Sequence, residues 1–396
     1  MLRRAIPLLI TLALVGAACS TSGNGESNGS GPNGNSKGPI LIGYPADLSG
    51  TYAFYDQPIE EGAQFAIDQI NASGGVLGYQ LELKTIDMRN DVAEGSKVTQ
   101  QLIDEGAKYL IGTTGDGFLA EASVACAAGI PISTGDGTAP TLVSDAGPCA
   151  FQWVMSDNVQ GATLAEWALQ QGYQTAYVIG SSEIPYTKNL PTYFTEVFEA
   201  GGGSVVGTDQ YKIGAGDYSA VVTKLANVSP QPDVIFTPMF VPDTQVFLRQ
   251  LRQAGITTPV VSTDGNLDPS LAEAGAKALN GFTFTASACP PEADPNIQKF
   301  FNDYKARYGK DPSSVIAALG YDEIYAVKAA FEAAGSTDPA KLIEAIKHVD
   351  YHGVTGELKM DPTTRRAEKP AALVQMQGDT FTCLGHPPYP SNVPKP

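Results

Sequence analysis

Short apolar runs alternate along the chain with longer stretches in which apolar residues recur every three or four positions. The first run is 40–42, and apolar residues then recur at helical intervals over 59–70. The runs predict strands, and the spacing predicts amphipathic helices. Further strands are expected at 81–86, 109–111, 130–132, 176–179, 205–206, 234–236 and 260–261. Strands that alternate with helices in this way predict parallel sheets with helices on both faces.

The alternation occurs in two successive sets. The first set has a helix that ends at Gly74–Gly75, and the second has a helix that ends at Gly201–Gly203, which indicates a duplicated architecture. Beyond Pro291 the pattern becomes helical, and two late apolar runs are expected to form closing strands. The helices are expected at 297–308, 315–334 and 340–349, and the closing strands at 371–376 and 380–382.

The N-terminus has the order of an export signal. Arg3 and Arg4 precede an apolar run at 5–18, and small residues then precede Cys19. This order predicts a cleaved signal peptide over 1–18. The small residues and Cys19 resemble the bacterial lipoprotein cleavage box, although Gly16 stands where that box usually has leucine. The resemblance implies lipidation of Cys19 and anchoring to the outer face of the cell membrane; ordinary secretion is the alternative.

Residues 19–38 are expected to be the lipidated cysteine and a flexible tether. Of the 19 residues from Ser20 to Gly38, 15 are glycine, serine or asparagine. A segment of this composition cannot bury an apolar core and stays unfolded. The globular body is therefore expected to begin near Pro39.

Charge and cysteine content narrow the function classes. The net charge of −17 argues against nucleic-acid binding, which needs a basic face, and against lying flat on an anionic lipid surface. Besides Cys19 the chain has an even number of cysteines, which predicts two disulfides in an exported protein. We favour Cys126 with Cys149 and Cys289 with Cys383, because the first two flank one short segment. Two other pairings stay open, as do buried free thiols.

Catalytic motifs are scarce. The three histidines, His348, His352 and His386, all lie near the C-terminus, so no dispersed His–Asp–Ser set is available. His348 and His352 are spaced like a metal pair, but the expected helix ends there, which favours surface histidines. The run 115–120 matches G-x-G-x-x-A, yet Asp116 would repel a phosphate. We therefore expect no enzyme, catalytic residue, metal or cofactor.

Several ordered segments carry a family resemblance. The run 43–62 resembles the opening of the branched-chain amino acid (leucine-type) binding proteins of ABC importers, and 70–78 is similar to the helix end of those proteins. The segments 111–112, 129–131, 138–140, 248–255 and 320–322 follow in the expected order. The resemblance covers about residues 39–383.

The resemblance implies a type I periplasmic-binding-protein fold of class α/β. Two doubly wound parallel-sheet lobes would be joined by a three-segment hinge and would close on a solute. Lobe 1 is expected to comprise 39–155 and 287–358, and lobe 2 to comprise 156–286 and 359–384, followed by a loose tail at 385–396. The implied partners are a small solute and an ABC permease with its ATPase, with the receptor a monomer.

The family's ligand residues are carried over onto individual positions. Tyr55 and Tyr186 would cover the ligand's side chain, with Phe240 beside it; core packing is the alternative for these aromatic residues. Thr138 would donate its hydroxyl to the ligand. Asp264 would be the acid for an α-ammonium group, although Asp264–Gly265 is also a typical turn pair.

Two aspartates depart from the family pattern. Asp116 replaces the serine that binds an α-carboxylate, and Asp136 replaces the alanine whose backbone lies beside it. An anionic group between two carboxylates would be repelled. A cationic or hydroxyl-rich solute would suit them better, with Trp153 as a stacking surface. Alternatively, Asp116 caps a helix and Asp136 belongs to a turn.

Two functions follow from this interpretation. The first is the extracytoplasmic solute receptor of an ABC importer, in which a solute that contacts both lobes stabilises the closed state. The second is a ligand-sensing receptor of the same fold that signals to a partner chain. An enzyme on the same scaffold is a third reading, since fold alone does not decide function.

Overall fold

The computed structural model describes residues 38–50 and 52–396. The signal peptide expected over 1–18, the lipidation site at Cys19 and nearly all of the tether expected over 19–38 lie outside the described residues. Within the part of the chain that the structure describes, no helix is long and apolar enough to cross a membrane.

The first sheet is five-stranded and entirely parallel. Its order is β2-β1-β3-β4-β5, as the alternating pattern predicted. The strands are β1 (Ile40–Ala46), β2 (Leu81–Asp87), β3 (Tyr109–Gly112), β4 (Ile132–Thr134) and β5 (Ala150–Gln152). Every residue of β3, β4 and β5 is buried, as is typical of parallel strands covered on both faces.

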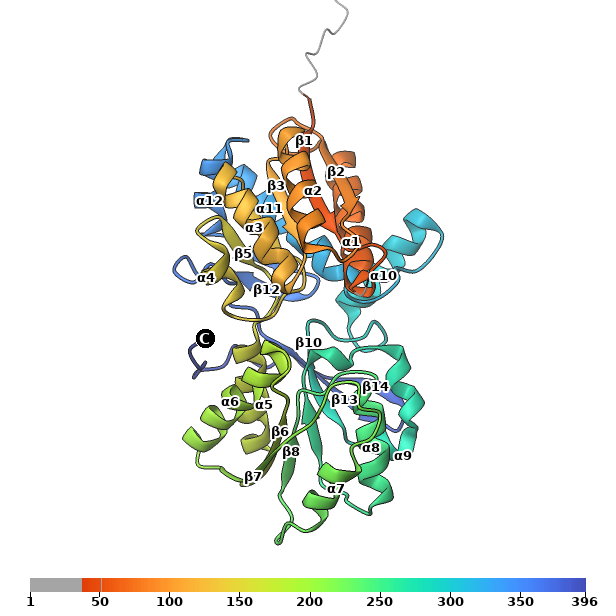
Figure 1. Cartoon of the computed structure of the whole chain (residues 1–396). Helices are drawn as coiled ribbons and strands as arrows, with labels where there is room; N and C mark the ends of the chain where they lie inside the picture. Colours follow the sequence, from red (N-terminus) through yellow and green to blue (C-terminus); the bar gives the residue numbers. More distant parts are fainter. Residues whose placement is uncertain (1–37, 51) are drawn as a thin grey trace, which may run out of the picture. The chain divides into compact units, whose positions relative to one another are not determined.

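Helices from both ends of the chain cover this sheet (Figure 1). They are α1 (Ala53–Ala72), α2 (Val92–Asp104), α3 (Gly115–Ala128), α4 (Leu142–Ala146), α10 (Pro295–Tyr308), α11 (Ala317–Ala334) and α12 (Pro339–Ile346). Helix α1 packs on α11. The two backbones meet so closely that a side-chain carbon at Gly62 would lie 1.7 Å from the backbone oxygen of Ala317. Glycine is therefore required there for close packing.

The second sheet is seven-stranded and mixed, in the order β14-β13-β10-β9-β8-β6-β7. Its strands are β6 (Thr175–Gly180), β7 (Ser204–Gln210), β8 (Val234–Phe236), β9 (Val260–Ser262), β10 (Thr283–Ala286), β13 (Ala372–Gln377) and β14 (Thr380–Gly385). Strands β6 to β10 are parallel, and β13 and β14 add antiparallel to one edge. The two closing strands predicted from the late apolar runs are confirmed.

The helices of the second sheet are drawn in green in Figure 1. They are α5 (Asp157–Gln170), α6 (Pro185–Ala200), α7 (Ser219–Ala226), α8 (Asp243–Gln253) and α9 (Ala276–Leu279), with short 3-10 helices η1 (Asp264–Asn266) and η2 (Pro269–Ala274). Each sheet has apolar cores of its own, in which Ile42 and Phe236, for example, are fully buried. The predicted α/β class with two lobes is confirmed.

The chain passes between the two sheets three times. The first crossing joins β5 to α5, the second joins β10 to α10, and the third precedes β13. The third boundary lies later than the expected break after residue 358. Met360 and Ala367 belong to the lobe 1 core, and Arg366 pairs with Gln152 at the end of β5. The apolar side chains of 360–367 thus keep this segment on lobe 1.

Several strands and helices were not predicted from the sequence patterns. The strands β5 and β10, the helices α4 and α5, and a hairpin of β11 (Asp350–Gly353) and β12 (Gly356–Lys359) were not predicted. Most of these elements are too short for a period to show. The helix expected at 340–349 ends at Ile346, so exposed His348 precedes β11 and exposed His352 lies within it. The two histidines therefore share no helix face.

Beyond Gly385, which ends β14, the tail forms no helix or strand, but it is not loose where it meets α5. Asn158 donates a hydrogen bond of 2.7 Å to the carbonyl of Pro394, and the backbone N–H of Ser391 donates to the Glu166 carboxylate at 3.2 Å. Pro390 and Pro394 are buried. A proline-rich composition thus prevents regular structure here without preventing packing.

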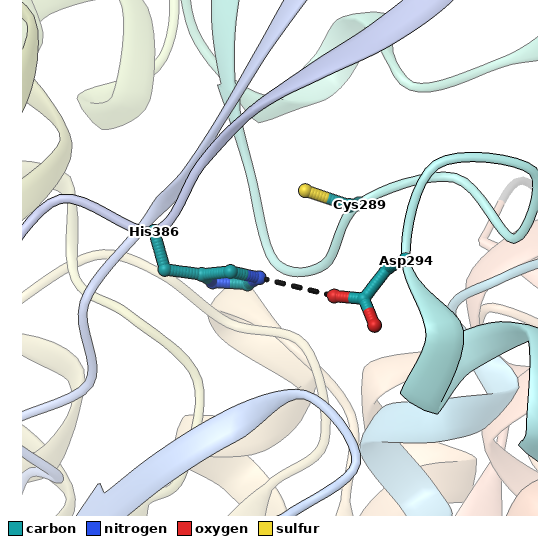
Figure 2. A group of neighbouring side chains, drawn as sticks. All are labelled: Cys289, Asp294 and His386. Carbon is teal, nitrogen blue, oxygen red and sulfur yellow. Dashed lines mark hydrogen bonds and ion pairs between the residues drawn. The ribbon is translucent and has the colours of Figure 1, made fainter.

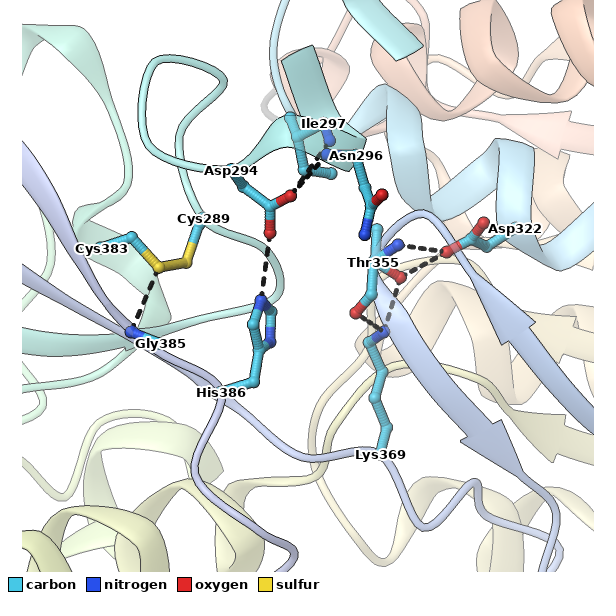
Figure 3. A network of polar contacts seen from close by, with 10 residues as sticks. All are labelled: Cys289, Asp294, Asn296, Ile297, Asp322, Thr355, Lys369, Cys383, Gly385 and His386. Atoms are coloured by element: carbon cyan, nitrogen blue, oxygen red, sulfur yellow. Dashed lines mark hydrogen bonds and ion pairs between the residues drawn. A yellow bond between two sulfur atoms is a disulfide. The ribbon is translucent and has the colours of Figure 1, made fainter. Parts of the chain in front are cut away.

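Both predicted disulfides are present. Cys126 at the end of α3 pairs with Cys149 before β5, and Cys289 in the second crossing pairs with Cys383 on β14 (Figure 3). The second bond fastens a crossing segment to the edge of the lobe 2 sheet.

A buried lysine fastens the third crossing to lobe 1 (Figure 3). Lys369 is fully buried and donates to the carbonyl and hydroxyl oxygens of Thr355, at 2.9 and 2.6 Å. Asp322 on α11 accepts from the backbone N–H and the hydroxyl of Thr355. Burial lowers the pKa of Lys369 to about 8, against the opposing effect of Asp322. The network satisfies a charged pair that burial would otherwise penalise.

The Cys126–Cys149 bond gives a first prediction. It closes a loop with a sequence separation of 23. The double variant Cys126→Ser/Cys149→Ser should lose about 3 kcal/mol of unfolding free energy, because the unfolded chain regains the entropy of an open loop. Urea unfolding of oxidised proteins measures the loss. Dithiothreitol should then destabilise the wild type more than the variant; a loss below about 0.5 kcal/mol would contradict the assignment.

Candidate functional site

Polar and aromatic side chains gather where the parallel strands of each sheet end. Asp136 lies in the loop that directly follows β4. Asp264 follows β9, Tyr186 lies in the first turn of the helix after β6, and Phe240 follows β8. The carboxyl ends of parallel strands are where open α/β sheets bind ligands. Each sheet therefore has candidate ligand groups at the carboxyl ends of its parallel strands.

A chain of hydrogen bonds runs from the loop after β4 into lobe 2. The backbone N–H of Asp157 donates to the carbonyl of Thr138 at 2.8 Å. Gln160, which is fully buried, donates to the Asp157 carboxylate at 3.4 Å. Its amide oxygen accepts from the backbone N–H of Asp264 at 3.2 Å and from the Thr285 hydroxyl at 2.7 Å. The amide of Gln160 thus orients Asp157 and Asp264 together.

Tyr186 fixes the carboxylate of Asp264. The tyrosine hydroxyl donates to Asp264 Oδ1 at 2.7 Å and is 2.6 Å from the Thr263 hydroxyl. Its ring meets Phe240 edge to face, with centroids 6.4 Å apart. Burial, followed by the negative charge of Asp264, raises the pKa of Tyr186 well above its ordinary value, so the hydroxyl keeps its proton. The predicted trio of Tyr186, Phe240 and Asp264 does come together.

Asp136 is the least satisfied acid of the group. Its Oδ1 is buried and accepts no hydrogen bond from the described residues. Burial, followed by the charge of Asp264, raises the pKa of Asp136 to about 7. The same two causes raise the pKa of Asp157 to about 8. Because Asp264 acts on both acids, the three carboxyl groups of the two lobes form one electrostatic group.

Tyr55 and Asp56 on α1 belong to the same surroundings. The pKa of Tyr55 is raised by burial, then by the charges of Asp264 and Asp136. Asp56 accepts the backbone N–H of Asp47 at 2.6 Å, and its pKa is raised by burial and by Asp136. Tyr55 also stacks at a tilt on Phe54, with ring centroids 4.0 Å apart. Helix α1 thus adds an aromatic ring and a fourth carboxyl group.

Two sequence-based assignments differ from the structure, and a third stays a prediction. Trp153 is not a stacking surface: it is buried in the lobe 1 core and donates to the Tyr109 hydroxyl at 3.0 Å. Asp116 is exposed in the first turn of α3, and no hydrogen bond of the described residues joins it to the other acids. Thr138 accepts the backbone N–H of Asp157 through its carbonyl, and its side chain lowers the pKa of the Asp157 carboxyl group; the predicted contact of its hydroxyl with a ligand stays a prediction.

Sequence reasoning missed Asp157 and Gln160. Both lie in the first turns of α5, and both are buried. Polar residues at a helix start ordinarily signal capping or a solvated face. The one available signal was that Asp157 and Gln160 occupy the i, i+3 positions of one helix face, directly after a predicted crossing. That signal becomes meaningful only when the crossing and the strand ends are known.

One further group of side chains has metal-ligand spacing. Cys289, Asp294 and His386 hold their ligand atoms within 4.8 Å of one another (Figure 2). The sulfur of Cys289 is bonded to Cys383, so it is not a thiolate ligand. Asp294 also accepts the backbone N–H groups of Asn296 and Ile297 at the start of α10. The group is accordingly a structural contact between the second crossing and the tail.

Comparison with known proteins covers both lobes. A family model described as "Periplasmic binding protein" matches residues 39–380. A leucine-, isoleucine-, valine-, threonine- and alanine-binding protein of Pseudomonas aeruginosa is 25% identical over 81% of this chain and 86% of its own length.

Solved structures agree with this match. A putative branched-chain amino acid ABC transporter protein of Rhodospirillum rubrum has a TM-score of 0.77 at 26% identity, over 87% of this chain and all of its own. A solute-binding protein of Rhodopseudomonas palustris, solved with 3,4-dihydroxybenzoic acid, has a TM-score of 0.75 over 90% of this chain and 99% of its own. At 19% identity, the latter similarity shows the fold alone.

The raised pKa values predict how the stability of the ligand-free protein changes with pH. An unfolded aspartate has a pKa of about 3.9, whereas Asp136 and Asp157 in the folded state have pKa values of about 7 and 8. Between these limits the folded protein holds protons that the unfolded chain has lost. The free energy of unfolding should therefore fall as pH rises from about 4 to about 8.

Calorimetry from pH 4.5 to 8.5 measures this dependence, and Asp136→Asn should make it shallower because the asparagine does not titrate. The matched control is Asp379→Asn, which removes an exposed carboxylate at the turn after β13. An Asp136→Asn profile that runs parallel to those of the wild type and the control would contradict the assigned burial of Asp136.

Proposed function

Because the chain belongs to the periplasmic binding protein family, we propose that it is the extracytoplasmic solute receptor of an ABC importer. The receptor would hold a small polar solute between its lobes and pass it to a membrane permease and its ATPase. The observation that carries the proposal is the match to both lobes, together with polar residues at the carboxyl edges of both sheets. The proteins it resembles include one named for amino acid binding and one named for ABC transport, which favours uptake over sensing.

The proposed mechanism needs binding and closure but no bond rearrangement. Asp136 and Tyr55 would contact the solute from lobe 1, and Asp264, Tyr186 and Phe240 from lobe 2. A solute that contacts both lobes lowers the free energy of the closed state only, so it shifts the population toward closure. The three crossings are short segments between regular elements, where hinge rotation is ordinarily absorbed.

Attachment to the membrane forms part of the same proposal. The cysteine at position 19 would carry the lipid, and the glycine- and serine-rich segment after it would tether the receptor beside the permease. The support is the order of basic, apolar and small residues before Cys19. The receptor would act as a monomer, because closure requires the two lobes of one chain.

A role as a binding protein rather than an enzyme fits the chemistry of the site. The side chains at the strand ends are carboxyl, hydroxyl, amide and aromatic groups. His348 and His352 are exposed beside and within β11, and His386 contacts Asp294 at 3.4 Å. Among the described residues, the site therefore has no imidazole within the group to act as a general base.

Uptake by cells tests the proposed function. A strain that lacks the chain should lose import of the solute that most raises the melting temperature of the purified protein, because ligand binding stabilises the folded state. The wild-type chain should restore import. Asp264→Asn should restore it poorly, with affinity reduced about tenfold or more, since a buried charge contact is lost.

The control for this experiment is Asp379→Asn, which should restore import fully. Small-angle scattering with and without the solute should show a smaller radius of gyration in the bound state. Import that continues unchanged in the strain without the chain would overturn the transport function, even if the purified protein binds the solute.

A further inference from the structure

The charged groups that gather at the candidate site are acidic. Asp136 from lobe 1 and Asp157 and Asp264 from lobe 2 share one electrostatic group, with Asp56 next to it. The charges that act on Asp136 and Asp157 come from other carboxyl groups, and no lysine or arginine is among them. The buried basic residue nearest the third crossing, Lys369, is engaged with Thr355 and Asp322. Among the described residues, no lysine or arginine therefore supplies a cation to this site.

One acceptor in this group has no partner. Oδ1 of Asp136 is buried, and no described residue donates a hydrogen bond to it. A buried carboxylate oxygen without a donor costs free energy, and native proteins seldom leave one so. The neighbouring acids are oriented by Tyr186 and Gln160, whereas this oxygen has no such support. A donor supplied by a ligand would satisfy it.

Two N–H groups of the loop after β4 are already engaged. After β4, the backbone N–H of Gly135 donates to the carbonyl of Gly112 at 2.9 Å, and that of Gly137 donates to the Thr134 hydroxyl at 2.8 Å. The backbone N–H of Asp136 lowers the pKa of its own carboxyl group, against the larger effects of burial and Asp264. Asp116 in the first turn of α3 further disfavours an anion at that helix start. The N–H groups of Gly135 and Gly137 are therefore not available to an anion.

Aromatic rings complete the surroundings. Tyr186 and Phe240 meet edge to face, and Tyr55 lies among the same charges as Asp136 and Asp264. The faces of such rings attract cations, and their carbon atoms pack against alkyl groups. Carboxyl groups beside aromatic rings therefore suit a ligand that is both cationic and partly apolar.

We infer that the ligand is an organic cation with N–H donors, an amine or guanidine, that carries no carboxylate. This inference rests on the proposed function for the location of the site, and it specifies the chemical class of the solute. The ammonium or guanidinium group would donate to Asp136 Oδ1 and to the carboxylates of Asp157 and Asp264. The alkyl part would pack against Tyr55, Tyr186 and Phe240.

Two pairs of probes separate the cation from the amino acid. Leucine and 3-methylbutylamine differ by the α-carboxylate alone, and so do arginine and agmatine. Each amine should raise the melting temperature of the purified protein more than its amino acid, and calorimetric titration should give at least about tenfold tighter binding of the amine. The carboxylate of the amino acid would meet Asp136 without a donor to receive it.

Variants test whether the carboxylates cause this preference. Asp136→Asn should weaken amine binding about tenfold or more and should narrow the difference between leucine and 3-methylbutylamine, because one repelling charge is gone. Asp157→Asn is the second variant, for the case in which Asp136→Asn does not fold. The exposed Asp379→Asn changes net charge equally and should leave both affinities unchanged.

The pH dependence of the affinity for an amine is a further test, and it does not depend on the shape of the amine. The titratable groups that interact with Asp136 are Tyr44 from β1, Asp56 and Tyr55 from α1, Glu121 from α3 and Asp264 from lobe 2. A cation favours their ionised forms, so its binding should release protons and tighten from pH 5 to pH 8. Titrations in two buffers of different ionisation enthalpy measure the proton release.

Three outcomes would overturn the inference. In the first, leucine binds as tightly as 3-methylbutylamine, or arginine as tightly as agmatine. In the second, a neutral polyol such as myo-inositol stabilises the protein when neither amine does. In the third, neither amine raises the melting temperature at millimolar concentration. A different result separates the inference from the proposed function. If the protein binds an amine but a strain without the protein still takes up that amine, the inference is supported and the transport function is overturned.

Discussion

Parallel strands deliver their carboxyl ends to one edge of a sheet, and in this protein the chain also crosses between sheets at that edge. The first crossing leaves the end of β5, and the second leaves the end of β10. The third enters β13 at Ala372, which pairs with Ala286, the last residue of β10. The candidate ligand groups and the segments that allow lobe movement therefore lie at the same edge. A ligand bound there acts directly on the segments that must rotate.

Each crossing is fastened by a different interaction. Asp157 begins the helix after the first crossing and donates its backbone N–H to Thr138 in lobe 1. Cys289 in the second crossing is bonded to Cys383, and Lys369 in the third donates to Thr355. The first of these contacts is the weakest and is the only one of the three made by a candidate site residue. A ligand that engages the Asp157 carboxylate would thus couple directly to the first crossing.

Much of the fold could be predicted from the sequence, because apolar residues recur at different intervals in strands and in helices. These intervals can be observed in one sequence. The runs at 371–376 and 380–382 became β13 and β14 for this reason. The boundary in the third crossing was wrong because the burial of Met360 and Ala367 depends on contacts with β5 and the lobe 1 core. No local pattern contains that information.

Some residues of the candidate site could be predicted from the sequence and others could not. Asp136 and Asp264 could be found because the family resemblance supplied their positions. Trp153 was misassigned since a large aromatic residue beside a crossing looks the same whether its indole faces solvent or, as here, bonds to buried Tyr109. Asp157 and Gln160 were missed because only tertiary burial separates them from ordinary helix-start residues.

A fold of this kind fixes where a solute binds but leaves its chemistry to a few loop residues. In this chain the decisive loop is the glycine-flanked turn after β4. Its glycines direct the backbone N–H groups of residues 135 and 137 inward, to Gly112 and Thr134, and leave the Asp136 carboxyl group as the part of the turn without a partner. A turn that uses its own donors for its own shape can no longer offer them to an anion. The preference for a cation is therefore a consequence of backbone hydrogen bonding as much as of charge, and it would persist only in part if Asp136 alone were neutralised.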